Sequence, residues 1–136
     1  MEPTLNVGDL IIVKGGVKPC DIIGDWPPNG TIIVFHKPGD EKTLIVHRAV
    51  KKIREGDTWI FRTKGDRSWY ITGEKYSVDP WKVKEEEIVG VVIGRIPLLG
   101  YVALFMQTRI GLVILIVLFA FLLFMELIPS RSGSEK

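Results

Sequence analysis

The sequence predicts a mainly β domain, in the form of a partly closed barrel, followed by one C-terminal transmembrane helix. Three observations predict this class. Five short apolar stretches are separated by turn signals, which favours antiparallel strands. A 16-residue run from Ile110 to Met125 carries no charge. The mean hydropathy is +0.21 although 25% of the residues are charged, which indicates one soluble and one lipid-facing part.

The strand candidates follow one another along the first part of the chain. They are Val7–Val13, Thr31–Phe35, Leu44–Val50, Thr58–Lys64 and Ile88–Ile93. Clusters rich in Gly, Pro, Asn and Asp separate them, at residues 26–30, 38–40, 55–57 and 65–66. Because nothing between them keeps a helical period over several turns, we expect an all-β domain.

Glu126, Leu127 and Ile128 extend the run to 19 positions, with Glu126 near one end, and Pro129 stops it. As a helix this run is about 28 Å long, close to the roughly 30 Å of a bilayer core. The alternative is the buried core helix of a soluble protein. A domain of about a hundred residues could hardly enclose a helix that is apolar on every side, so we interpret the run as a membrane span.

These features divide the chain into a β domain at 1–108, a transmembrane helix at 109–128 and a polar, disordered tail at 129–136. Arg131 and Lys136 follow the span and Arg109 precedes it. The excess of positive charge after the span favours a cytoplasmic tail and a β domain on the extracytoplasmic face. The apolar segment Leu98–Met106 has two interpretations: a connection packed on the barrel, or an interfacial segment with Tyr101 at headgroup level.

The composition excludes several classes of function. A net charge of +2 excludes a strongly basic nucleic-acid arm, and the single cysteine, Cys20, excludes a disulfide framework and a Cys-rich zinc site. No P-loop, GxGxxG, HExxH or CxxC motif occurs. We therefore expect no cofactor, no metal and no nucleic-acid partner.

Few residues are candidates for chemistry, and each also has a structural explanation. His47 lies mid-strand, where a half-buried strand residue is common, and His36 follows a strand, where a solvated loop is expected. Asp66 stands in a Gly-Asp turn, and Asp79 precedes Pro80 in a turn or cap. The tryptophans are best interpreted as packing anchors: Trp26, Trp59, Trp69 and Trp81.

The order of six short motifs is more informative than any one of them. They are Met1-Glu2-Pro3-Thr4-Leu5, Gly8–Val13, Ile45–Arg48, Thr63–Asp66, Asp79–Trp81 and Ile88–Gly90. In this order they resemble the type I signal peptidases, membrane-bound serine proteases that remove signal peptides from exported preproteins. His47 stands where bacterial members have a lysine, which is similar to the archaeal and endoplasmic-reticulum branch.

The resemblance implies roles for five residues. His47 is the general base, Asp79 orients its imidazole, and Asp66 holds the site together in its turn. Met1 contributes a backbone N–H to the oxyanion hole, and Pro3 lies beside an extended substrate. The Asp66–Asp79 spacing, with Arg67-Ser68 in place of the usual asparagines, leaves open which aspartate orients His47. The expected location is the cell membrane.

The resemblance also places the nucleophilic serine immediately before Met1, ahead of which family members carry an N-terminal anchor. We interpret the start as a misassigned codon or a fragment boundary; a natural inactive form is the third interpretation. The remaining serines, at 68, 77, 130, 132 and 134, are poorly placed to replace it.

Two alternatives remain. The first is a catalytically inactive, membrane-tethered β domain that binds extended peptides. The second is a repressor-type self-cleaving protease, which needs a catalytic lysine on a strand and a soluble chain, so the apolar span counts against it. Only three amide residues occur, Asn6, Asn29 and Gln107, which is typical of heat-loving organisms and favours an archaeal source.

Overall fold

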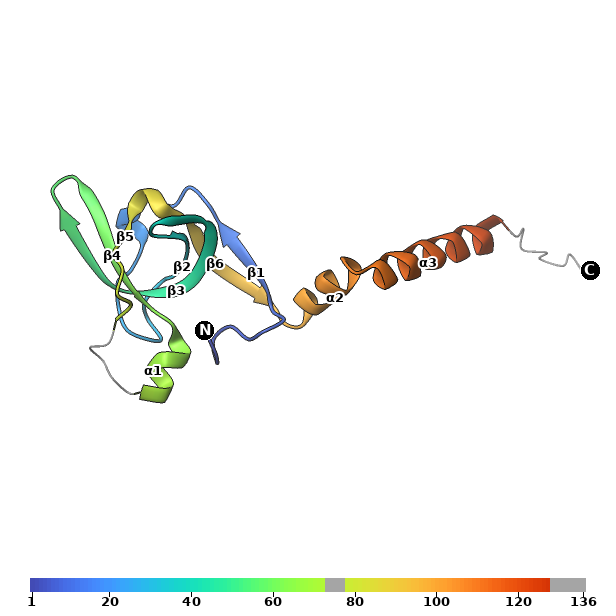
Figure 1. Ribbon diagram of the computed structural model, residues 1–136, viewed down its shortest axis with the longest axis horizontal. Coiled ribbons are helices and arrows are strands. Elements are labelled where there is room, and N and C mark those ends of the chain that lie inside the picture. Colours follow the sequence, from blue (N-terminus) through green and yellow to red (C-terminus); the bar gives the residue numbers. More distant parts are fainter. Residues whose placement is uncertain (73–77, 128–136) are drawn as a thin grey trace, which may run out of the picture.

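The structure is a computed structural model that describes residues 1–72 and 78–127. Within those residues a six-stranded antiparallel sheet forms the domain, in the order β1-β6-β2-β3-β4-β5 (Figure 1). The strands are β1 (Leu10–Lys14), β2 (Ile32–Lys37), β3 (Asp40–Glu55), β4 (Thr58–Lys64), β5 (Val83–Lys84) and β6 (Ile88–Ile96). A mainly β protein with an apolar C-terminal helix is therefore confirmed.

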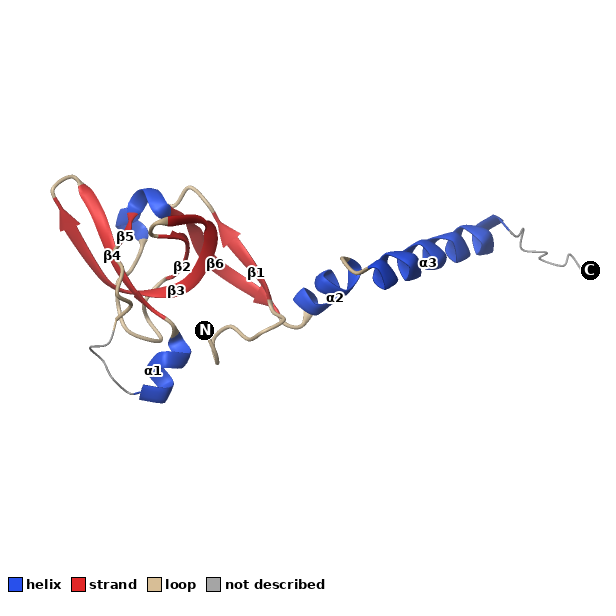
Figure 2. Ribbon diagram, viewed as in Figure 1, coloured by secondary structure: helices blue, strands red, loops and turns tan. Residues whose placement is uncertain are grey.

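The sheet is strongly curved along β3, whose two halves pair with different strands (Figure 2). The first part of this 16-residue strand pairs with β2 and the last part pairs with β4. A register shift between Ala49 and Lys51 lies on the β4 side, and such bulges sharpen the bend of a strand. The edge strands β1 and β5 do not pair with each other in the described part of the chain. The sheet is thus a partly closed barrel.

The hydrophobic core lies among the central strands. Its members are Ile22, Ile33, Phe35, Ala49, Phe61, Val83 and Val91. Phe35 and Phe61 are fully buried, and each buried aromatic ring of this size contributes on the order of a few kcal/mol. This core fixes β3 and β4 side by side, and these two strands supply most of the candidate site.

The predicted strand boundaries agree best with the observed ones where apolar and polar residues alternate most clearly. β4 has the predicted bounds, whereas β3 extends beyond the predicted Leu44–Val50 on both sides. β1 begins later than predicted, because Val7–Asp9 belong to a turn in which Gly8 has a φ of +87°. The prediction of a loop for His36 is wrong: it lies within β2, half-buried, and its Nδ1 lies 2.6 Å from the carbonyl oxygen of Glu41.

Two short elements were not predicted. Helix α1 (Asp66–Thr72) follows β4 directly, and β5 contains only two residues. Both are shorter than the window over which hydrophobic periodicity can be recognised. Two 3₁₀ turns, η1 (Pro19–Asp21) and η2 (Glu85–Glu87), complete the domain.

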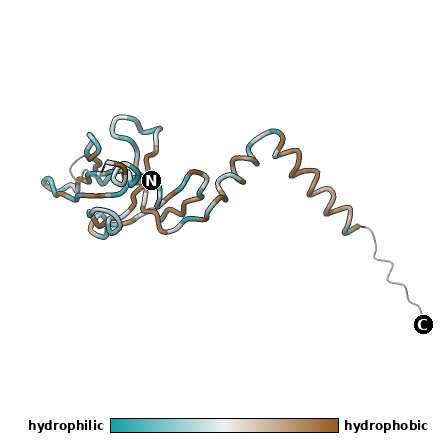
Figure 3. Tube along the Cα trace, turned by 90° about the horizontal axis from the view of Figure 1, so that it is seen from below, coloured by the Kyte–Doolittle hydropathy of each residue, from teal (hydrophilic) through white to brown (hydrophobic). Residues whose placement is uncertain are grey.

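The apolar segment after β6 forms helix α2 (Leu99–Met106), and α3 (Arg109–Leu127) follows it at a bend (Figure 3). The Thr108 hydroxyl accepts a hydrogen bond from the Gly111 N–H at 3.0 Å, which caps the start of α3. α3 has a mean hydropathy of 2.9 and is 6% buried, so it is long and apolar enough to cross a membrane. The predicted tail, 129–136, and residue 128 lie outside the described residues.

Helix α2 is joined to the domain through the turn before β1. The Gly100 N–H donates to the Gly8 carbonyl at 2.9 Å. A Cβ atom at Gly8 would lie within 2.5 Å of three atoms of the Tyr101 ring, so a side chain there has no room. The start of α2 therefore packs on the domain, as one of the two interpretations of this segment expected.

Asp9 connects this same turn to β6. Its carboxylate accepts hydrogen bonds from the Asn6 backbone N–H at 2.9 Å and from Arg95 Nη1 at 2.6 Å. The Asn6 N–H, followed by the Arg95 guanidinium, lowers the pKa of Asp9 below its ordinary value.

A lowered carboxyl pKa makes the contribution of Asp9 to stability dependent on pH. That contribution is complete above the unfolded-state pKa of about 3.9 and is lost as the pH falls through the lower folded-state pKa. We expect Asp9→Asn to lower the unfolding free energy at pH 7 and the difference from wild type to vanish in strong acid. Unfolding by denaturant, measured across pH, checks this. The fully exposed Asp57 supplies the control Asp57→Asn, and an equal effect of that variant would contradict the expectation.

Candidate active site

The candidate site begins with a histidine and an aspartate brought together from distant parts of the chain. His47 is on β3, in register with Ile33 of β2, and Asp79 lies just before β5. His47 Nδ1 is 2.7 Å from Asp79 Oδ2, and the two side chains are 26% and 17% exposed. Since an ionised carboxylate only accepts, Nδ1 carries the proton and the other ring nitrogen, Nε2, can accept one. Of the two candidate aspartates, Asp79 is the one that contacts His47.

The backbone beside the histidine ring is Gly65, at the end of β4. A Cβ atom at this position would lie 3.1 Å from His47 Nε2 and 3.4 Å from its Cδ2. A larger residue would crowd the nitrogen that has to meet a reacting group. Glycine here leaves that edge of the ring open.

Asp79 has a second partner on β4. The Thr63 hydroxyl donates to Asp79 Oδ2 at 2.6 Å, and the Asp79 N–H donates to the Thr63 carbonyl at 2.9 Å. The Trp81 indole N–H donates to Thr63 Oγ1 at 3.2 Å. Sequence reasoning gave neither Thr63 nor Trp81 a role in the site, although both lie inside motifs that it had singled out.

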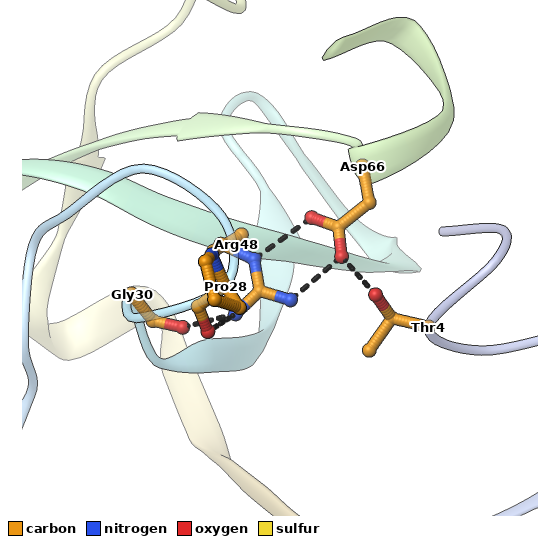
Figure 4. Close-up of polar contacts among 5 residues, drawn as sticks. All are labelled: Thr4, Pro28, Gly30, Arg48 and Asp66. Atoms are coloured by element: carbon orange, nitrogen blue, oxygen red, sulfur yellow. Dashed lines mark hydrogen bonds and ion pairs between the residues drawn. The ribbon is translucent and has the colours of Figure 1, made fainter. Parts of the chain in front are cut away.

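Asp66 belongs to a separate, buried network around Arg48 (Figure 4). His47 is hydrogen-bonded to Asp79 and not to Asp66. Arg48 donates from Nε to Asp66 Oδ1 at 2.8 Å and from Nη2 to Oδ2 at 2.6 Å. Its Nη1 reaches the carbonyls of Pro28 and Gly30. Asp66 is fully buried and Arg48 is 4% exposed, so this is a bidentate ion pair inside the domain.

The same carboxylate holds the N-terminal segment. The Thr4 hydroxyl donates to Asp66 Oδ2 at 2.5 Å (Figure 4). An exposed ion pair of 3.3 Å between Glu2 and Arg67 joins the segment to α1 as well. Asp66 therefore ties residues 1–4 to the corner where β4 ends.

A surface pocket of about 300 Å³ lies between this segment and the sheet. It is lined by Met1, Glu2, Leu5, Asn6, Val7, Ile11, Val46 and Arg67. Val46 precedes His47 on β3, so the pocket is beside the histidine strand. Met1 is half-buried at its edge, whereas Pro3 is exposed and is not among the lining residues.

The remaining candidates are serines, possible metal ligands and tryptophans. Ser68 is exposed on α1, and the serines at 77, 130, 132 and 134 lie outside the described residues. Among residues 1–72 and 78–127, no group of three or more His, Cys, Asp or Glu side chains is arranged to hold a metal ion. The rings of Trp26 and Trp69 pack against each other in a tilted arrangement, with their centroids 5.1 Å apart.

A histidine that is oriented by an aspartate, on a β domain with an apolar helix behind it, has the base-and-acid arrangement that serine hydrolases use. Comparison with known proteins makes the class more specific. The chain is 32% identical over 109 residues to the signal peptidase complex catalytic subunit SEC11 of Pyricularia oryzae, covering 79% of this chain and 59% of that protein. The Sclerotinia sclerotiorum subunit of that name is 31% identical over 109 residues, covering 72% and 63% respectively.

A third relative, from Tuber melanosporum, is 32% identical over 114 residues and has the same name. No family model and no solved structure matches the chain. The resemblance to the type I signal peptidases is confirmed, and the chain is a homologue of these fungal catalytic subunits. It spans about three fifths of the length of the curated relatives it matches.

Proposed function

We propose that this chain is the catalytic part of a serine-type signal peptidase that is anchored in the membrane by α3 and removes signal peptides from preproteins. The observation that carries the proposal is the 2.7 Å contact between His47 Nδ1 and Asp79 Oδ2 in a homologue of signal peptidase catalytic subunits. The relatives are subunits of a complex, so partner subunits are part of the proposal.

The mechanism assigns one step to each group. His47 Nε2 accepts the proton of a serine hydroxyl, whose oxygen attacks the scissile carbonyl carbon and forms a tetrahedral intermediate. His47 then gives that proton to the leaving amine, and a water molecule hydrolyses the acyl-enzyme in the same way. Asp79 keeps the imidazole aligned and stabilises its cation. The family resemblance places the serine directly before Met1.

The substrate contacts extend this proposal. The Met1 backbone N–H helps to stabilise the oxyanion, and the pocket between Met1 and Val46 accepts a small substrate side chain. Pro3 faces the extended preprotein at the rim of this site. The domain at 1–108 acts on the extracytoplasmic face of the cell membrane, α3 spans it within 109–128, and the tail follows. The three relatives reported above are fungal and give an archaeal source no support, so that source stays a prediction resting on the amide count.

The test is preprotein cleavage in proteoliposomes. The chain is extended at its N-terminus by a serine and the anchor segment of a fungal relative, and the matched control has alanine in place of that serine. We expect cleavage at the signal peptide junction, measured by mass spectrometry, only with the serine. If both proteins bind the preprotein and neither cuts it, the active enzyme is excluded and the inactive peptide-binding domain takes its place.

A further inference from the structure

The carboxylate of Asp79 has two side-chain partners among the described residues, His47 and Thr63, and both bind the same oxygen, Oδ2. A carboxylate orients an imidazole only where something other than that imidazole orients the carboxylate. Asp79 is 17% exposed, so water could compete for its oxygens. Thr63 is therefore the protein group that can fix Asp79 independently of His47.

Thr63 is well suited to fix it. The residue is fully buried on β4, in register with Ala49 of β3. Its β-branched side chain has restricted χ1 freedom, so its hydroxyl has a defined position. Its carbonyl also accepts the Asp79 N–H at 2.9 Å. The main chain and the carboxylate of Asp79 are thus both held by one residue of a rigid strand.

Trp81 sets the direction of the Thr63 hydroxyl proton. An indole N–H can only donate, so Thr63 Oγ1 must accept the hydrogen bond from Trp81 at 3.2 Å. The hydroxyl hydrogen of Thr63 is then left to point at Asp79 Oδ2, 2.6 Å away. Trp81 itself packs against the hydrophobic core. The two hydrogen bonds thus form a chain in which Trp81, anchored at the core, donates to Thr63 and Thr63 donates to Asp79.

We propose that Thr63 and Trp81 are positioning residues, Thr63 holding Asp79 against His47 and Trp81 acting through Thr63. Their meaning for catalysis rests on the proposed function, but the arrangement itself does not. Two donors on one oxygen also compete, and competition alone predicts that removing Thr63 tightens the His47–Asp79 contact. Positioning predicts that the contact loosens. The two effects have opposite signs and can be told apart.

The experiment measures how fast the His47 Nδ1–H proton exchanges with water, by NMR of the ¹⁵N-labelled chain in detergent micelles. Thr63→Val removes the hydroxyl at nearly constant volume. We expect exchange about tenfold faster or more, since a hydrogen bond to an ionised group corresponds to about one to two powers of ten in an equilibrium constant. Thr63→Ser restores the hydroxyl and should return exchange to within a few-fold of wild type.

Trp81→Phe keeps most of the ring but removes the N–H, and we expect it to accelerate exchange by less than Thr63→Val. This variant also keeps the proposal testable if Thr63→Val does not fold. Thr58→Val, at the other end of β4, is the matched control and should leave exchange unchanged. Unchanged or slower exchange in both Thr63→Val and Trp81→Phe would overturn the proposal.

A second measurement connects the arrangement to cleavage. In the serine-bearing chain, Thr63→Val is expected to lower kcat about tenfold or more with KM within twofold, and Thr63→Ser to recover it. A loss confined to KM contradicts a role in positioning the base. If exchange responds as expected but His47 proves dispensable for cleavage, the arrangement stands and the proposed function fails. If the exchange rate of the His47 proton does not change in these variants while cleavage still requires His47, the positioning role of Thr63 and Trp81 fails and the proposed function stands.

Discussion

Replacing His47 by alanine is expected to reduce preprotein cleavage by about 10⁴- to 10⁶-fold in kcat, the range found when the general base of a serine hydrolase is removed. Without the imidazole no group accepts the serine proton or returns it to the leaving amine. His47 is 26% exposed, so the variant should keep its fold. Single-turnover cleavage in proteoliposomes, with unfolding measured in parallel, checks this.

The chain contains its own control for this substitution. His36 is the other histidine, on the neighbouring strand β2, and its Nδ1 lies 2.6 Å from the backbone carbonyl oxygen of Glu41. His36→Ala is expected to leave kcat within about threefold of wild type. Equal losses in the two variants would show a general effect of losing imidazole from the sheet. Full activity in His47→Ala would remove His47 from the mechanism.

The fold was predictable where its determinants are local. Alternating apolar residues and turn residues are sufficient to place β4 with its correct bounds and to separate the other strands. The bounds of β3 were not predictable, because its charged ends become strand only by pairing with β2 and β4. A strand such as β5, two residues long, exists only because β4 offers an edge.

The candidate site was predictable in part for a similar reason. His47 and Arg48 are adjacent, yet alternation along a strand directs them into different networks, one ending in Asp79 and the other in Asp66. The family resemblance singled out all three of His47, Asp66 and Asp79. It could not supply the Thr63 contact, since a register of strands and a turn 16 residues away bring that hydroxyl to Asp79. The pairing of the strands, and not the local sequence, places Asp79 against His47 and Asp66 against Arg48.

Replacing Asp66 by alanine is expected to lower the unfolding free energy by about 3–5 kcal/mol, because breaking a buried ion pair leaves the other charge without compensation. The charge left behind is that of Arg48, which is 4% exposed and keeps, among residues 1–72 and 78–127, only the Pro28 and Gly30 carbonyls as partners. Urea unfolding followed by tryptophan fluorescence measures the change. The exposed pair Lys82–Glu55, at 2.7 Å against 2.6 Å for Arg48–Asp66, supplies the control: Glu55→Gln should cost less than about 1 kcal/mol.

The double variant Arg48→Met with Asp66→Leu separates the charge effect from packing. It removes both charges, so most of the stability lost in Asp66→Ala should return. The Thr4 hydroxyl still loses its acceptor in the double variant, and with it the bond that ties residues 1–4 to the end of β4. We therefore expect cleavage to stay impaired in the double variant even where stability is recovered.

Asp79→Asn should show the opposite pattern to Asp66→Ala, with near-native stability and a kcat about 10⁴-fold lower. The assignment of Asp66 to stability and Asp79 to catalysis would be wrong if Asp66→Ala left stability intact while Asp79→Asn unfolded the domain.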